Sequence, residues 1–295
     1  METLRDTIRN ITKKHLEENN GLILGQCLSA VGWVDNTVPN TKGVIELPMT
    51  DVAGADIAVG CAIAGIRPIL VIRFQDFLML NGNALVYFAA KRKEIFGKSV
   101  PIFVRALAKE GNGTGNSHSG KIHSTFTHFP GLRLYAPITS GEYQSCWNDF
   151  MANDDPAICF EHRDTFNNTS EYPDIIRNDA EITIIGISLA RMNILSALSL
   201  HPIKTDMFKI IFLDSDVLNQ DIIDSLKKTR RGLIVDTGYE KCSISRDFAY
   251  RYMIETGAKI DVLGIKQKSV GCKIGSENLT PSVEEILDRI NRILE

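Results

Sequence analysis

Residues 47–77 read LPMTDVAGADIAVGCAIAGIRPILVIRFQDF, and the architecture of the chain can be inferred from this stretch outward. Asp51 opens a segment rich in alanine and glycine that predicts a helix, which Gly65 ends and Pro68 prevents from continuing. The continuous apolar run at 69–72 is typical of a strand buried on both faces. A buried strand directly after a helix indicates an α/β protein with a parallel sheet.

The alternation of strand and helix patterns continues on both sides of this stretch. A polar segment without periodicity, residues 166–178, predicts a linker between two parts. We therefore expect a larger α/β domain at 1–165 and a smaller α/β domain at 179–295. The strands that we expect lie at 22–24, 44–46, 69–72, 102–106, 132–135, 157–160, 182–185, 209–213, 232–236 and 259–263.

Composition is that of a globular protein, with 44% hydrophobic and 23% charged residues. The net charge of -3 argues against a sequence-independent grip on nucleic acid, which needs a basic face. No apolar run approaches the roughly 18 residues that a membrane-spanning helix needs. The polar, amphipathic start lacks the pattern of a signal peptide, and the six cysteines are scattered, so we expect a cytoplasmic protein with reduced thiols.

Two loops at the carboxyl ends of expected strands carry candidate binding residues. Ligands of open α/β sheets bind at this edge, so the loop that ends at Asp51 is placed for a site. The alternative is that Thr50 or Asp51 only caps the helix that follows. Phe74 and Phe77 follow the strand at 69–72 and could form a stacking surface, but one of them could equally fill the core.

A third candidate is the glycine-rich segment 111–128, which carries His118, His123 and His128 at five-residue intervals. This spacing turns the histidines to different faces of a helix or strand, which disfavours a shared metal ion. A glycine-rich loop that carries His118 is more typical of a mobile active-site loop. Solvated histidines without a role are the alternative.

Three stretches in this order resemble the beta subunit of the thiamine-dependent, decarboxylating component of 2-oxo-acid dehydrogenases. They are LPMTDVAGADIAVGCAIAGIRPI, FQDF followed by AAK, and HSGKIHSTFTHFPGLRLYAP. The resemblance covers essentially the whole chain. It implies a parallel-sheet pyrimidine-binding domain at 1–165, followed by a smaller α/β transketolase C-terminal domain at 179–295.

The resemblance also implies a partner. In the family, the alpha subunit of an α2β2 heterotetramer holds the diphosphate and magnesium through a Gly-Asp-Gly motif, and no Gly-Asp-Gly occurs in these 295 residues. Thiamine diphosphate would therefore be shared with an alpha subunit that brings the magnesium, and this chain alone would be inactive. The segment 153–156, with Asn153 and Asp155, resembles a stretch that binds potassium in some members.

Roles for single residues follow from the same resemblance. Asp51 takes the place of a glutamate that hydrogen-bonds the ring nitrogen of the aminopyrimidine and so activates the cofactor. Phe77 matches the aromatic residue that packs against the pyrimidine. His118 matches the histidine that helps to transfer the acyl group, and His128, a further catalytic candidate, matches a second family histidine just before Pro-Gly-Leu.

Three departures from the family pattern bear on activity. Asp51 is one methylene shorter than glutamate, roughly 1.5 Å of reach, and a misplacement near 1 Å can cost about 100-fold in rate. Arg73 stands where the family often has an apolar residue beside the pyrimidine. If it reaches Asp51, it would keep that carboxylate ionised and compete for its oxygens. The stretch VGCKIGSENLT at 270–280 lacks the family's V-P-x-P-like run, which weakens the case for docking to a large dehydrogenase complex.

These observations leave three hypotheses. The first is a catalytic beta subunit that cleaves or forms a C–C bond next to a carbonyl of a 2-oxo acid or a ketose, by decarboxylation with acyl transfer or by transketolase-like or carboligase-like transfer. The second is a divergent subunit without chemistry that regulates its partner, which Asp51 and Arg73 favour. The third is an unrelated α/β protein. We favour the first because Phe77, His118 and the glycine-rich loop are retained.

Overall fold

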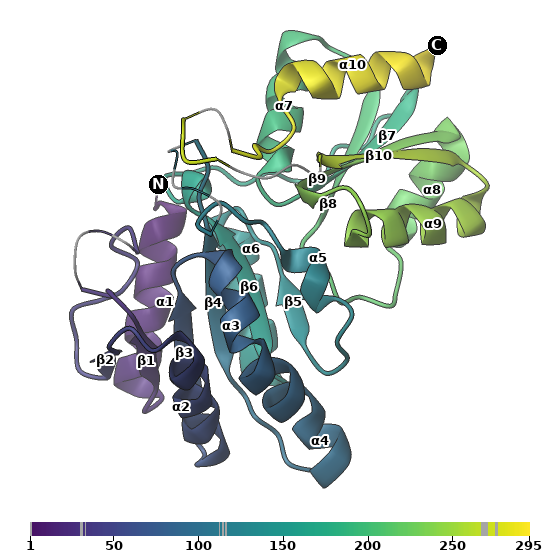
Figure 1. Cartoon of the computed structure of the whole chain (residues 1–295). Coiled ribbons are helices and arrows are strands. Elements are labelled where there is room, and N and C mark those ends of the chain that lie inside the picture. Colours follow the sequence, from purple (N-terminus) through teal and green to yellow (C-terminus); the bar gives the residue numbers. More distant parts are fainter. Residues whose placement is uncertain are drawn as a thin grey trace.

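The structure is a computed structural model that describes residues 2–29, 32, 34–111, 113, 115, 117–266, 271–274 and 277–295. Its strands form two separate parallel sheets, each covered by helices (Figure 1). The α/β architecture expected from the alternating pattern is therefore confirmed. We call the elements around the larger sheet the first unit and those around the smaller sheet the second unit.

The six-stranded sheet belongs to the first unit, and all its neighbouring strands pair in parallel. Because strands that run in the same direction end at the same edge, the loops after them gather at one side of the unit. In spatial order the strands are β2 (Val44–Glu46), β1 (Leu22–Gly25), β3 (Pro68–Ile72), β4 (Phe103–Ala108), β6 (Ala157–His162) and β5 (Arg133–Tyr135).

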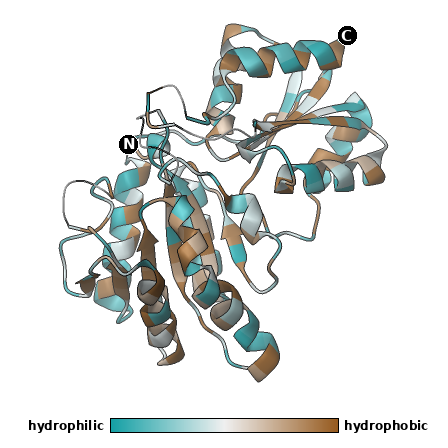
Figure 2. Cartoon of the chain, viewed as in Figure 1, coloured by the Kyte–Doolittle hydropathy of each residue, from teal (hydrophilic) through white to brown (hydrophobic). Residues whose placement is uncertain are grey.

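Helices cover both faces of this sheet because successive side chains of each strand point to opposite sides. Ile69 and Val71 pack toward one apolar cluster, and Leu70 and Ile72 toward the other. Figure 2 shows the resulting hydrophobic residues along the strands. One face carries α1 (Leu4–Glu18) and α6 (Ser140–Ala152), and the other carries α2 (Asp51–Ile63), α3 (Leu78–Gly82), the π-helix η2 (Asn83–Ala90) and α4 (Lys91–Phe96).

The second unit is built in the same way around four parallel strands. Its last helix, α10 (Val283–Leu294), begins with a capping box formed by Ser282 and Glu285. The spatial order is β10 (Lys259–Ile265), β9 (Arg231–Tyr239), β7 (Ile182–Ile187) and β8 (Thr205–Ile210). One face carries α7 (Ala190–Leu200) and α10 (Val283–Leu294), and the other carries α8 (Gln220–Thr229) and α9 (Ile244–Thr256).

The strand expected at 209–213 is wrong, because β8 ends at Ile210. The apolar residues that follow belong to a contact between the units. Ala136 N donates to the carbonyl of Ile211, and Leu213 N donates to the carbonyl of Leu134, both at 2.8 Å. An apolar run that covers another unit looks like a strand core in the sequence.

The predicted linker is held to both units. Arg5 N donates to the carbonyl of Phe166 at 2.9 Å, and Ile175 exchanges two backbone hydrogen bonds of 2.8 Å with Met207. One apolar cluster also runs through both units and includes Phe160 and Phe248. The boundaries at 165 and 179 stay a prediction.

Among the residues that the structure describes, none of the helices has the length and apolar character that a membrane span requires.

Candidate active site

A small pocket opens at the carboxyl ends of β1 and β3, where the first turn of α2 meets α3. Asp51, Arg73 and Phe77 all line it, so the structure brings together three of the candidate residues. The complete lining is Gly25, Gln26, Leu47, Asp51, Gly54, Leu70, Val71, Ile72, Arg73, Phe77 and Asn81.

Asp51 is the first residue of α2, and its side chain is half-buried at the pocket. The N-cap residue is Thr50, whose hydroxyl donates to the carbonyl of Pro48 at 3.1 Å. In the described part of the chain the Thr50 side chain makes no capping bond to the helix, so the capping hypothesis is wrong for Thr50. The negative charge of Asp51 still suits the first turn electrostatically.

Arg73 is buried beside Asp51 in the pocket wall, with 7% of its surface exposed. Its Nη2 donates to Gln26 Oε1 at 3.2 Å and lies 3.6 Å from Met49 Sδ. Arg163 Nη2 donates to the carbonyl of Arg73 at 2.7 Å, which holds the backbone where β3 ends. Among the residues that the structure describes, no ion pair joins Arg73 to Asp51.

Three rings form the aromatic side of the site. His118 lies edge-on to Phe74 and Phe77, with ring centroids 4.5 Å and 5.3 Å apart, and the two phenylalanine rings are 5.9 Å apart. Phe74 is buried in the core, and Phe77 is half-buried and lines the pocket. Phe74 therefore fills the core, as one alternative expects, and a stacking role for Phe77 stays a prediction.

The three histidines of the glycine-rich segment lie in three environments. His118 packs against Phe74 and Phe77. His128 is exposed in the turn after α5 (His123–Phe126), and it is not among the described residues that line the pocket. His123 is buried, with Nε2 3.0 Å from Asp236 Oδ1 in β9. Burial alone would raise the pKa of Asp236, but the neighbouring His123 lowers it below its usual value.

The segment proposed for potassium is already in contact with two cationic side chains. Arg67 Nη1 donates to the carbonyl of Asn153 at 2.8 Å, and Arg67 also pairs with Asp154. Lys93 Nζ lies 2.6 Å from Asp155 Oδ1. These cations would compete with potassium for the same oxygens, and the potassium site stays a prediction.

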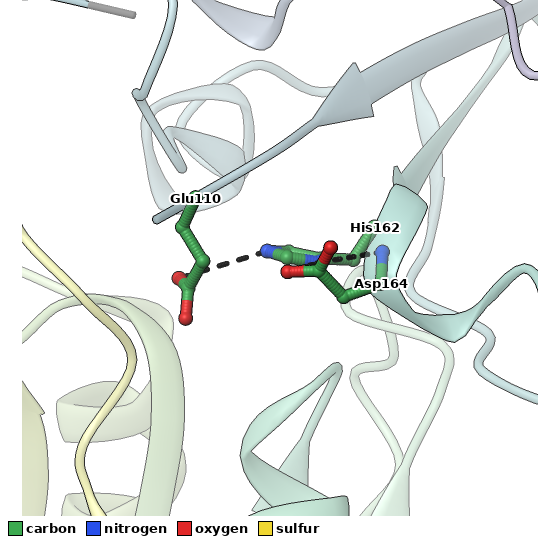
Figure 3. Close-up of side chains that lie close together, drawn as sticks. All are labelled: Glu110, His162 and Asp164. Atoms are coloured by element: carbon green, nitrogen blue, oxygen red, sulfur yellow. Dashed lines mark hydrogen bonds and ion pairs between the residues drawn. The ribbon is translucent and has the colours of Figure 1, made fainter. Parts of the chain in front are cut away.

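The sequence did not single out a cluster of Glu110, His162 and Asp164, which lies at the carboxyl ends of β4 and β6 (Figure 3). His162 Nε2 is 3.7 Å from Glu110 Oε2, and His162 Nδ1 is 3.7 Å from Asp164 Oδ2. Such side chains can bind metal ions, and one ligand atom from each lies within 4.8 Å of the others. However, Lys121 Nζ is 2.7 Å from Glu110 Oε2 and already supplies a positive charge.

Burial and charge act in opposite directions on this cluster. Burial alone would raise the pKa of Glu110, but His162 and Lys121 together hold it well below its usual range. The only sequence signal for these residues was their place after two expected strands, which many polar residues share.

The stretch at 270–280, which departs from the family pattern, is described only in part, since 270, 275 and 276 lie outside the described residues.

The fold and the pocket together define a parallel α/β protein with a pocket at the carboxyl edge of its larger sheet. A family described as the pyrimidine binding domain of transketolase matches residues 11–168, more than half of the 295 residues. The chain therefore belongs to this family. The hypothesis of an unrelated α/β protein is wrong.

Curated relatives extend over most of the chain. The pyruvate dehydrogenase E1 component subunit beta of Rickettsia felis is 26% identical over 276 residues, which cover 85% of this chain and 83% of that protein. The acetoin:2,6-dichlorophenolindophenol oxidoreductase subunit beta of Bacillus subtilis is 27% identical over 285 residues, with coverage of 84% and 82%. The resemblance to dehydrogenase beta subunits is thus confirmed.

Solved structures agree in fold. A transketolase from Campylobacter jejuni has a TM-score of 0.74 at 15% identity, and the match covers 98% of this chain but 46% of that longer one. A split-gene transketolase, described as an inactive beta4 tetramer, has a TM-score of 0.68 at 13% identity, with coverage of 99% and 98%. At these identities the likeness shows the fold alone.

Proposed function

We propose that this chain is the pyrimidine-binding subunit of a thiamine-diphosphate enzyme made of two kinds of chain. The observation that carries this proposal is the pocket in which Asp51 and Phe77 lie together at the carboxyl edge of the sheet. The reaction cleaves or forms a C–C bond next to a carbonyl of a 2-oxo acid or a ketose. The relatives named as pyruvate dehydrogenase and acetoin oxidoreductase subunits support this reaction class.

The pocket suits a flat heterocycle with polar atoms on its rim. Leu47, Leu70 and Phe77 supply apolar walls, and the carboxylate of Asp51 stands at the start of α2. Asp51 would hold a proton at a ring nitrogen, and Phe77 would pack against the ring face. When bound, thiamine diphosphate supplies a nucleophilic carbon for the carbonyl of the substrate.

His118 lies on the aromatic side of the same site, beside Phe77. An imidazole has two ring nitrogens that can donate or accept a proton, so His118 is chemically suited to exchange a proton with a substrate oxygen. We assign it to the transfer of the acyl or ketol group. His128 would act with it only if the assembled enzyme brings its exposed turn to the site.

A partner chain is needed to cover the pocket. Helices α2, α3 and η2 lie against one another and expose large apolar side chains next to it, and Figure 2 shows hydrophobic residues along α2. A monomer rarely leaves such a surface open to water. The exposed apolar residues of these helices include Val52, Ile57, Ile63, Met79, Leu80, Tyr87 and Phe88, and Met49 in the loop before α2 is exposed as well.

The alpha partner would bring the diphosphate and magnesium sites, because Gly-Asp-Gly is absent from this sequence. An α2β2 heterotetramer is the assembly that the family resemblance implies. We expect this chain to be inactive without that partner. The alternative of a regulatory subunit without chemistry gains no support from a site that retains Phe77 and His118 and still places a carboxylate, that of Asp51, in the pocket.

Co-purification with the chain encoded beside it, followed by calorimetric titration with thiamine diphosphate and magnesium, tests the proposal. We expect tight binding by the pair and no binding by this chain alone. Pyruvate turnover by the pair would then identify the acyl-transfer branch. Absence of binding by the pair, or binding by this chain without any partner, would contradict the shared site.

A further inference from the structure

Successive residues after His118 make hydrogen bonds or ion pairs first to one unit and then to the other. The backbone contacts to the first unit come first. Gly120 N donates to Asp76 Oδ2 at 2.8 Å, and Ile122 N donates to Gln75 Oε1 at 3.2 Å. Both acceptors belong to the 3-10 turn η1 (Gln75–Phe77), which also carries the aromatic ring of the pocket. The backbone of the loop is thereby fastened to the cofactor side of the site.

The intervening residues are held by the second unit through their side chains. Lys121 Nζ donates to the carbonyl of Asn278, in the second unit, at 2.6 Å, and it also pairs at 2.7 Å with Oε2 of Glu110, which follows β4 of the first unit. His123 Nε2 lies 3.0 Å from Asp236 Oδ1. The side chains of both pairs are largely or fully buried, so solvent screens the attraction between their charges little.

Both attachments are closely packed. A Cβ atom built on Gly120 would lie 2.4 Å from Asp76 Oδ1, and one built on Gly238 would lie 2.6 Å from His123 Cε1. The next residue adds a further tie to the second unit, because Ile244 N donates to Ser124 Oγ at 3.1 Å. The loop therefore has little freedom to shift relative to either unit.

We propose that Lys121 and His123 are positioning residues through which the second unit sets the place of His118. In this role the second unit serves the group-transfer step and leaves cofactor binding to the pocket in the first unit. The functional part of this inference rests on the proposed role of His118. The structural part, that the second unit orders the loop, stands without it.

Hydrogen exchange of the full chain, alone and with its partner, tests the structural part. Lys121→Met removes the tie to Asn278, and Lys121→Met combined with Glu110→Gln does so without leaving a buried carboxylate uncompensated. Amides of residues 117–123 should exchange about tenfold faster or more in both variants, because local opening becomes easier.

Arg191→Met is the matched control, because Arg191 and Glu142 form another buried ion pair of 2.7 Å, which joins α7 of the second unit to α6 of the first. This variant should leave exchange at 117–123 unchanged. Unchanged exchange in the double variant, or an equal increase with Arg191→Met, would overturn the inference.

Kinetics of the assembled pair test the functional part. The double variant should lower kcat while the Kd for thiamine diphosphate with magnesium stays at the wild-type value. A parallel loss of cofactor affinity would mean that the second unit supports the pocket, which overturns the assignment to His118. If the wild-type pair shows no thiamine-dependent turnover, the proposed function fails, and the exchange result still decides whether the second unit positions the loop.

Discussion

The pocket lined by Asp51 and Phe77 and the loop after His118 lie side by side but differ in how they are held in the structure. Around the pocket, Asp51 is half-exposed and Met49 and Val52 point large apolar groups to solvent. In the loop, the residues from Gly120 to His123 are each bonded to another segment. On the proposed function, the chain builds the transfer side of the site by itself and leaves the cofactor side to be closed by a partner.

Of the substitutions considered, Asp51→Ala in the pocket should have the largest effect on activity. Loss of a group that handles a proton lowers rates by about 100-fold or more, so thiamine-dependent turnover of the pair should nearly vanish. The free energy of unfolding should change by only about 1 kcal/mol, because a first-turn carboxylate contributes little to stability. Initial rates and urea unfolding provide the two measurements.

Asp56→Ala is the control for this change, since Asp56 is an exposed acid on the same helix. Its turnover should stay near the wild-type rate. Wild-type turnover in Asp51→Ala would remove Asp51 from the mechanism.

Gly120→Ala tests whether the loop after His118 is packed more tightly than helix α2 beside the pocket. The new Cβ would meet Asp76 Oδ1 at 2.4 Å, and overpacking of this kind destabilises proteins by about 1–3 kcal/mol. Gly60→Ala on α2 should be neutral or stabilising, because among the described residues nothing lies within 4 Å of its Cβ and alanine favours a helix. Thermal unfolding of both variants measures the difference.

A second substitution separates a local clash from a general defect. Asp76→Ala in the Gly120→Ala background removes the carboxylate that the methyl group meets, so the double variant should recover part of the lost stability. Strictly additive losses would show that the two residues do not compete for the same space.

The smallest expected effect is a pH dependence of the tie between Asp76 and Gly120. Burial raises the pKa of Asp76 above its usual value of 3.8, against the opposing hydrogen bond from Gly120 N. A raised pKa in the folded state means that this carboxyl group favours folding most below pH 3.8, and that this contribution is lost as pH rises through the folded value.

Asp76→Asn keeps an oxygen acceptor for Gly120 N and removes the titration. The free energy of unfolding of the variant minus that of the wild type should therefore rise from about pH 4 upward and then level off. The size of the change measures the pKa shift, at about 1.4 kcal/mol for each pKa unit. A difference that stays constant from pH 4 to 7 would contradict the raised pKa.

The pocket could be predicted from the sequence and the loop contacts could not. Asp51 and Phe77 follow expected strands, and parallel strands end at one edge, so local patterns were enough to place them together. Lys121 meets Asn278 across 157 positions of the chain, and no local period connects them. The role of Asp236 was hidden for the same reason, since only the folded chain brings it to His123.

Mistakes in the strand assignment had a similar cause. Residues 210–213 are apolar, and part of this run covers the first unit, as the hydrogen bond from Leu213 N to the carbonyl of Leu134 shows. The true strand, β8, includes buried Asp206, which Ser225 Oγ and Lys228 Nζ satisfy. A charged residue in a strand core gives a misleading signal when its partners come from elsewhere in the chain.

The apolar cluster that runs through both units also bears on how the protein is made. It combines Phe126 and Phe160, which are synthesised early, with Ile187 and Phe248, which are synthesised late. The first half of the nascent chain therefore leaves the ribosome with part of its apolar surface uncovered. Completion of the fold should be a late event in translation, and chaperones that bind exposed apolar segments should find this chain a good client until its last third is made.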